Sequence, residues 1–277
     1  MGTCGWVWVR VGGGVVVSGW RFAVSTLGAP GVPVRESARV AAEHGCHGLE
    51  VRVHPDEEVR VGITAAQAAR VREEVAGAGV EIACLAGYVR VCAPGGAVVD
   101  ELRALVELAG VLGAPAVRVF PGGGDGEGVA DEVAVERIGA VLPELRDAGV
   151  RLLVETHDSH ATGEAAVRLV EPLGEPGVAA VLWDAVHPWR SGESPERTRA
   201  VLGEYLGYFQ VKDVEAGGST PVPPGAGVVP LGECGRVLGD WSGWVSLEWE
   251  RAWYPGIEPL RVPLRAAAEW FEVWRPR

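Results

Sequence analysis

The 277-residue sequence predicts an α/β fold, a single (β/α)8 TIM barrel. Short apolar runs alternate with longer helical stretches about every 30 residues, which is the length of one strand–helix unit. Strands that are apolar almost throughout are typical of a parallel sheet covered on both faces. Eight such units in ~250 residues match the strand number and size of the barrel. A doubly wound open sheet is the alternative, but the first predicted strand lacks the glycine-rich phosphate turn usual in that fold.

The predicted strands are rich in Val, Leu, Ile and Ala, and Gly, Pro or Asp residues separate them from the next element. In chain order they are 22–25, 48–53, 80–85, 116–120, 151–155, 178–184, 205–211 and 244–248. The clearest predicted helices are 64–78, 98–112, 129–148 and 163–173. Residues 1–20 are predicted to be a poorly ordered N-terminal extension, and 21–277 to form the barrel domain.

Composition excludes several classes of protein. There are 37 acidic and 25 basic side chains, a formal net charge of −12, which argues against a nucleic-acid partner. No apolar run approaches the ~18 residues of a membrane span, so we expect a soluble protein with no membrane partner. The five cysteines form no C-x-x-C pair, which disfavours a disulfide framework or structural zinc and indicates the cytoplasm.

Polar side chains stand at the carboxyl ends of the last four predicted strands. They are Glu155, Asp184, Gln210 and Glu248. Because the carboxyl ends of all barrel strands meet at one rim, where active sites of this fold lie, we expect these four side chains to converge.

Three converging carboxylates repel each other and lose hydration unless a positive charge lies between them. A divalent metal supplies that charge, and the amide oxygen of Gln210 can be a fourth ligand. Four oxygen donors without an imidazole favour Mg²⁺ or Mn²⁺ over Zn²⁺. The alternative is that each carboxylate caps a helix or pairs with one of the many arginines.

Six segments resemble the sugar phosphate isomerase/epimerase family of the xylose isomerase-like TIM barrel superfamily. They are LEVRVHPDEE (49–58), APAVRVFPGG (114–123), VETHDSH (154–160), LWDAVHPWR (182–190), FQVKD (209–213) and SLEWE (246–250). The resemblance covers about 22–274, and relatives include hydroxypyruvate isomerase, ketose 3-epimerases, and inosose and dehydroshikimate dehydratases. The usual family quartet is Glu, Asp, His and Glu. Gln210 stands at the His position, a replacement that the family also shows.

The resemblance implies a metal-dependent isomerase or epimerase that acts on a sugar or small hydroxycarbonyl compound. Glu155 and Glu248 are then both metal ligands and the acid/base pair, moving protons through a metal-bound enediolate. A dehydratase on the same metal site is the first alternative, and a non-catalytic binding barrel the second. Endonuclease IV, also in the superfamily, takes extra His ligands after strands two and three. Here Cys84, Leu85, Ala86 and Gly87 end the third strand, which argues against that activity.

Further residues near the same rim are candidates for binding substrate. The family often places a substrate-contacting His at the position of His187, and His157 follows Glu155 closely. Lys212, two residues beyond Gln210, faces the same way along the strand and is expected to steady a substrate oxyanion or to form a buried salt bridge. Arg52 and Arg118 are candidates for binding a phosphate or carboxylate. A homodimer is the candidate assembly.

Overall fold

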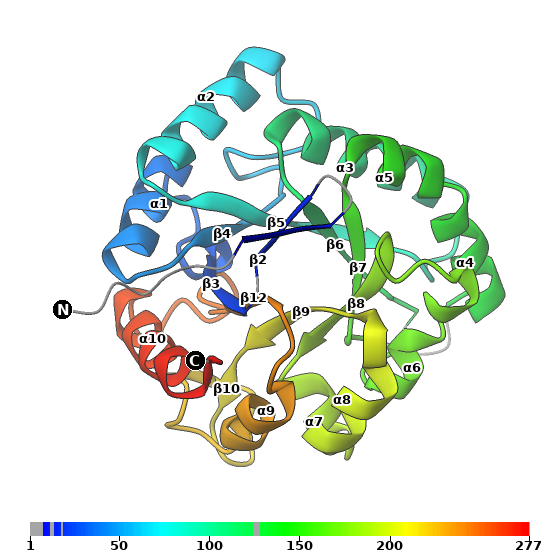
Figure 1. Cartoon of the computed structure of the whole chain (residues 1–277). Coiled ribbons are helices and arrows are strands. Elements are labelled where there is room, and N and C mark those ends of the chain that lie inside the picture. The colour runs from blue at the N-terminus through cyan, green and yellow to red at the C-terminus, as the bar shows by residue number, and fades with distance from the viewer. Residues whose placement is uncertain (1–7, 12–13, 18, 124–127, 277) are drawn as a thin grey trace.

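The structure, a computed structural model, describes residues 8–11, 14–17, 19–123 and 128–276. Eight parallel strands form a closed barrel, which confirms the predicted fold class (Figure 1). Neighbouring strands follow the chain order, and the last strand pairs with the first to close the barrel. The barrel strands are β3 (Trp20–Ser25), β4 (Gly48–Arg52), β5 (Glu81–Arg90), β6 (Ala116–Phe120), β7 (Arg151–Glu155), β8 (Ala179–Asp184), β9 (Leu206–Val211) and β12 (Gly243–Leu247).

Helices surround the barrel on its outside (Figure 1). They are α1 (Val34–Glu43), α2 (Ala65–Gly77), α3 (Val98–Leu112), α4 (Asp131–Gly139), α5 (Leu142–Ala148), α6 (Gly163–Val167), α7 (Val186–Arg190), α8 (Pro195–Leu202), α9 (Leu231–Leu238) and α10 (Arg261–Trp274). The helix predicted at 129–148 is divided into α4 and α5. Pro143 lies in the first turn of α5, where its ring and missing N–H prevent a continuous helix. None of the described helices is long and apolar enough to cross a membrane.

A short antiparallel pair, β1 (Trp8–Val11) and β2 (Gly14–Val17), precedes the barrel. Residues 1–7, 12–13 and 18 of the predicted N-terminal extension lie outside the described residues. The first barrel strand begins at Trp20, two residues before the predicted start. Trp20 is buried and stacks on Trp270 of α10. This contact with the last helix explains why the strand begins at Trp20.

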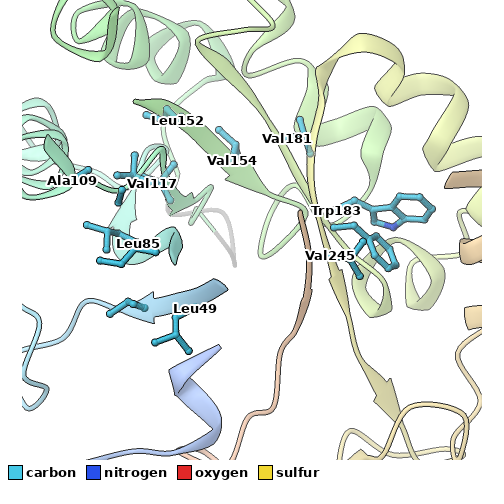
Figure 2. Close-up of a cluster of buried hydrophobic side chains, with 14 of the residues drawn as sticks. Leu49, Leu85, Ala109, Val117, Leu152, Val154, Val181, Trp183 and Val245 are labelled. Carbon is cyan, nitrogen blue, oxygen red and sulfur yellow. The ribbon is translucent and has the colours of Figure 1, made fainter. Parts of the chain in front are cut away.

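The alternation of side chains along each strand decides which residues enter the barrel. On β7, Leu152 and Val154 join the large cluster between strands and helices, and Figure 2 shows both among its members. Leu153 belongs instead to the smaller cluster inside the barrel. Glu155, two residues further, takes the next inward position at the carboxyl end of the strand. Asp184 follows the inward-facing Leu182 on β8 in the same way.

At the opposite, amino-terminal end of the barrel, His47 holds the entry to β4. Its Nδ1 accepts a hydrogen bond of 2.9 Å from the backbone N–H of Phe22, and burial lowers the pKa of the imidazole below its usual 6.5. The unfolded chain therefore binds a proton more readily than the folded one, and the stability contributed by neutral His47 is lost as the pH falls below about 6.5.

Replacement His47→Asn keeps an acceptor for the Phe22 N–H but removes the titration. We expect the free energy of unfolding to fall less between pH 7.5 and 5.5 in this variant than in the parent, measured by urea unfolding. His44, which follows the C-terminus of α1, provides a matched control when changed to asparagine. An equal pH dependence in the parent and His47→Asn would contradict the assignment.

Candidate metal centre

Glu155, Asp184, Gln210 and Glu248 meet inside the barrel, at the carboxyl ends of β7, β8, β9 and β12. One carboxylate oxygen from each of Glu155, Asp184 and Glu248 lies within 4.8 Å of the other two. The Gln210 amide joins them, because its Nε2 lies 3.2 Å from Oε1 of Glu248. The side chains that the sequence placed at one rim are therefore in one buried cluster.

Glu50, on β4, is a fourth buried acidic residue in this cluster, and it was not among the predicted site residues. Its side chain is 0 % exposed, and its Oε1 accepts a hydrogen bond of 3.0 Å from Nε2 of Gln210. Both acceptors of the Gln210 NH₂ group are thus carboxylates. An ionised carboxylate has no proton to donate to an amide oxygen. With both carboxylates ionised, the amide turns its nitrogen to Glu50 and Glu248, and its oxygen points elsewhere.

Two cations hold the acidic cluster together. The first is Lys212, whose Nζ lies 2.9 Å from Oε2 of Glu248, 2.6 Å from Oε1 of Glu250 and 3.5 Å from Oδ2 of Asp184. Burial opposes the charged form of Lys212, but these carboxylates outweigh it and raise the pKa of the amine well above its usual value. Lys212 is therefore a fixed positive charge that contacts two members of the quartet.

The second cation is Arg118 on β6, which is buried inside the barrel. Its Nε lies 3.1 Å from Oε2 of Glu155, and its Nη2 lies 4.0 Å from Oε1 of Glu248. Nη1 donates to the carbonyl of Gly87 at 3.0 Å, and the guanidinium lies over the Phe120 ring. In the structure Arg118 is thus a partner of the two catalytic candidates, and the Gly87 carbonyl and the Phe120 ring hold its guanidinium in place.

These two cations leave the centre with excess negative charge. Five carboxyl groups surround them: Glu50, Glu155, Asp184, Glu248 and Glu250. Burial raises the pKa of Glu155 to about 8, in spite of Arg118, and raises that of Glu50 to about 7. Burial removes the hydration of these carboxylates, so their ionised forms need a compensating positive charge.

The residues present fit a divalent ion that binds oxygen. Within the described part of the chain, three buried oxygens of the quartet accept no hydrogen bond: Glu155 Oε2, Asp184 Oδ2 and Gln210 Oε1. The first two have an ion pair instead, with Arg118 at 3.1 Å and with Lys212 at 3.5 Å. Buried oxygens of this kind are costly without a partner, and a hard cation satisfies them without needing donor hydrogens. The donor set and the excess charge therefore both agree with the predicted metal quartet.

A cavity of about 350 Å³ opens above the quartet. Glu155 and Glu248 form part of its floor, and Tyr88, Phe120 and Trp253 contribute aromatic walls. Tyr88 enters the cavity because β5 continues to Arg90, although the predicted strand ended at Leu85. The pairing of β5 with β6 shifts register in this extension, where Gly87 packs so closely on Leu105 that an added Cβ would lie 2.5 Å from it.

The remaining predicted substrate residues differ in their positions. His157 lines the cavity. The centroid of the His187 ring lies 4.3 Å from the centroid of the His157 ring. Arg52 is nearly buried and pairs with Glu57 at 2.7 Å, while its Nε donates to the Tyr88 hydroxyl at 2.8 Å. Its guanidinium also lies 5.1 Å from the centre of the Trp253 ring. Arg52 thus supports the aromatic wall from behind.

The sequence model of the family described as xylose isomerase-like TIM barrel matches residues 38–274. The chain belongs to this family. Its fold agrees with solved structures of other xylose isomerase-like barrels at low sequence identity. A search of curated protein sequences gives no match.

Three solved structures illustrate the similarity. The probable 3-DHS dehydratase AsbF of Bacillus anthracis is 16% identical, with 91% of this chain and 98% of that one covered and a TM-score of 0.70. A D-psicose 3-epimerase is 17% identical, with 91% and 98% covered and a TM-score of 0.72. The IOLI protein, solved with a zinc atom, is 16% identical, with 91% and 97% covered and a TM-score of 0.73. At these identities the likeness shows the shared fold.

The hydrogen bond between Gln210 and Glu50 leads us to predict that Glu50 supports metal binding in this xylose isomerase-like barrel. In Glu50→Leu, of similar volume, the Gln210 amide loses one of the two acceptors that fix its orientation. We expect the affinity for Mn²⁺, measured by titration calorimetry, to fall roughly 10–100-fold, as is usual when a partner of a metal ligand is removed. Glu50→Gln retains an acceptor oxygen and should lose less. Parental affinity in both variants would contradict the role of Glu50.

Proposed function

We propose that the chain is a divalent-metal-dependent isomerase or epimerase that acts on a sugar or small hydroxycarbonyl compound. The observation that carries the proposal is the meeting of Glu155 and Glu248 at the floor of one cavity, together with Asp184 and Gln210. Mn²⁺ or Mg²⁺ suits the oxygen-only quartet. The epimerase and dehydratase folds that resemble this chain are consistent with this reaction class.

Proton transfer is the chemistry that this arrangement supports. When bound, a dication stabilises negative charge that develops on the carbonyl and hydroxyl oxygens of the substrate. Glu155 extends from β7 and Glu248 follows β12, so their carboxylates reach the cavity from different walls. One carboxylate removes the proton from the carbon beside the carbonyl, and the other returns a proton to the neighbouring carbon or to the opposite face.

The neighbouring residues position this pair and bind the substrate. Arg118 fixes Glu155, and Lys212 fixes Glu248, each through an ion pair of about 3 Å. His157 and His187 lie beside Glu155 and are proposed to contact substrate oxygens. The aromatic walls of the cavity exclude water from the reacting carbon, which prevents loss of the abstracted proton to solvent.

The test is proton exchange by the chelator-stripped protein with added Mn²⁺ or Mg²⁺. Ketoses, inososes and hydroxypyruvate are incubated in D₂O, and mass spectrometry of the recovered compounds measures deuterium. Deuterium gained without loss of water supports the isomerase or epimerase. A product lighter by one water identifies the dehydratase instead. If the stripped protein binds neither metal in calorimetry, the proposal is wrong and a non-catalytic binding barrel replaces it.

A further inference from the structure

We propose that Arg90 forms an anion subsite at the mouth of the cavity, so that the substrate carries a carboxylate or phosphate group remote from its carbonyl. The inference deepens the proposed function and rests on it, because the quartet determines where the carbonyl lies. The described residues that line the cavity include two arginines, Arg90 and Arg118. Only one of them is already neutralised by the protein.

The two arginines that the sequence indicated for an anion are both paired with glutamates. Arg118 contacts Glu155, and Arg52 contacts Glu57. Arg90, by contrast, is exposed at the end of β5, and its side chain makes no ion pair or hydrogen bond with the described residues. Its guanidinium is therefore the one at this cavity that keeps its donors for a ligand.

The stem of the Arg90 side chain is held in place although its guanidinium has no partner among the described residues. Gly122 packs directly against it, since a Cβ added to Gly122 would lie 2.7 Å from Cβ of Arg90 and 3.1 Å from its Cδ. Gly122 also has a φ of 71°, a conformation that glycine adopts readily and other residues rarely do. The glycine thus leaves room for the arginine stem, and this packing restricts where the guanidinium can lie.

The strand register places Arg90 further toward the mouth than the quartet. On β6, Arg118 pairs with Ala86 of β5, and Phe120, two residues later, pairs with Arg90. Two residues of a strand span roughly 7 Å. Arg118 contacts the quartet carboxylates, so Arg90 lies one inward-facing position beyond them. A substrate with its carbonyl at the quartet therefore presents its far end, several carbons away, to Arg90.

The charges around Arg90 leave it available to an anion. Asp158 lines the same cavity, and its pKa is lowered first by the hydrogen bond with His157 and further by the charge of Arg90. Because Nδ1 of His157 lies 2.7 Å from Oδ1 of Asp158, this carboxylate has a partner of its own. A planar guanidinium binds two oxygens of a carboxylate or phosphate side by side. Arg90 can therefore recognise either group.

The test compares three ketoses that differ only at the sixth carbon: D-fructose, its 6-phosphate, and D-fructuronate, which ends in a carboxylate. Calorimetry measures their binding to the full-length chain loaded with Mn²⁺. We expect the parent to bind one anionic ketose more tightly than D-fructose, and the preferred one distinguishes carboxylate from phosphate. In Arg90→Gln this ketose should bind roughly 10-fold more weakly, as expected for a charged hydrogen bond at a site open to solvent. The affinity for D-fructose should not change.

Two further variants separate a specific contact from a general change of charge. Arg265→Gln removes one exposed positive charge from the outer helix α10 and should bind all three ketoses as the parent does. Arg90→Lys keeps the charge without the planar group and should recover part of the affinity. A parent that binds neither anionic ketose more tightly than D-fructose overturns the subsite. An equal loss for charged and neutral ketoses in Arg90→Gln also overturns it.

Incubation of the same ketoses in D₂O separates the subsite from the proposed function. Deuterium gained as fast by D-fructose as by the anionic ketoses would leave the isomerase or epimerase standing and overturn the subsite. An anionic ketose that binds in dependence on Arg90 but exchanges no deuterium would support the subsite and count against the proposed reaction.

Discussion

Glu155→Gln is expected to lower turnover by about 10²–10⁴-fold, the usual contribution of a positioned acid or base. Glutamine keeps an oxygen that can bind the metal, but it cannot accept a proton from carbon. It also loses the ion pair with Arg118, which becomes a buried cation beside a neutral amide. Turnover is measured on whichever substrate shows proton exchange, and Mn²⁺ affinity is measured on the same preparation.

Glu248→Gln should behave in the same way, because Glu248 is the other half of the proposed pair. Glu144→Gln, on the outer helix α5 and paired there with Arg103, is the control for the loss of a carboxylate remote from the cavity. The far-ultraviolet circular dichroism of all three variants should match that of the parent. A Glu155 or Glu248 variant that keeps more than about a tenth of the parental rate contradicts the acid/base assignment.

The second large effect is expected in the metal-free protein when Lys212 is changed to methionine. Methionine has a similar length but no charge, so Asp184, Glu248 and Glu250 lose their shared cation inside the barrel. Removing one partner of a buried ion pair typically destabilises a protein by about 3–5 kcal/mol. Urea unfolding in the presence of a chelator measures the change.

Added Mn²⁺ distinguishes this electrostatic effect from poor packing. The dication supplies charge that Lys212 no longer provides, so saturating Mn²⁺ should stabilise Lys212→Met more than it stabilises the parent. Glu250→Gln is the matched control, since it leaves Lys212 paired with Glu248 and should be much less destabilised. A free energy of unfolding within about 1 kcal/mol of the parent would show that Lys212 is not needed to neutralise the cluster.

The fold could be predicted because each barrel strand is a buried apolar run followed by a turn. The predicted and observed bounds of β6 and β7 coincide, and those of α3 do as well. The extension of β5 beyond Leu85 was missed because Gly87 and Tyr88 interrupt the apolar pattern there. A register shift of this kind depends on the partner strand β6, and periodicity within one segment carries no information about it.

The quartet could be predicted because its members stand at strand ends, where position in the chain determines position on the rim. Glu50 was missed because it lies in the middle of the short strand Gly48–Arg52, two residues before the strand ends. The sequence signal that could have found it is a single carboxylate among the residues of a predicted buried strand. Arg118 shows the opposite difficulty. Its pairing with Glu155 depends on the distance between β6 and β7, and from sequence alone an arginine near a rim is equally consistent with an anion site.

The contact between Glu50 and Gln210 and the pairing of β12 with β3 have a consequence for synthesis on the ribosome. The candidate metal centre includes residues from the second and seventh barrel strands and from the end of the eighth. One hydrogen bond, between Gln210 and Glu50, joins residues that are 160 positions apart in the chain. A nascent chain that has not yet released Gly243–Leu247 carries Glu155 and Asp184 without Glu248 and without the closing seam. If the proposed quartet binds a metal, complete coordination requires the last strand, and tight metal binding would then report that the barrel has closed.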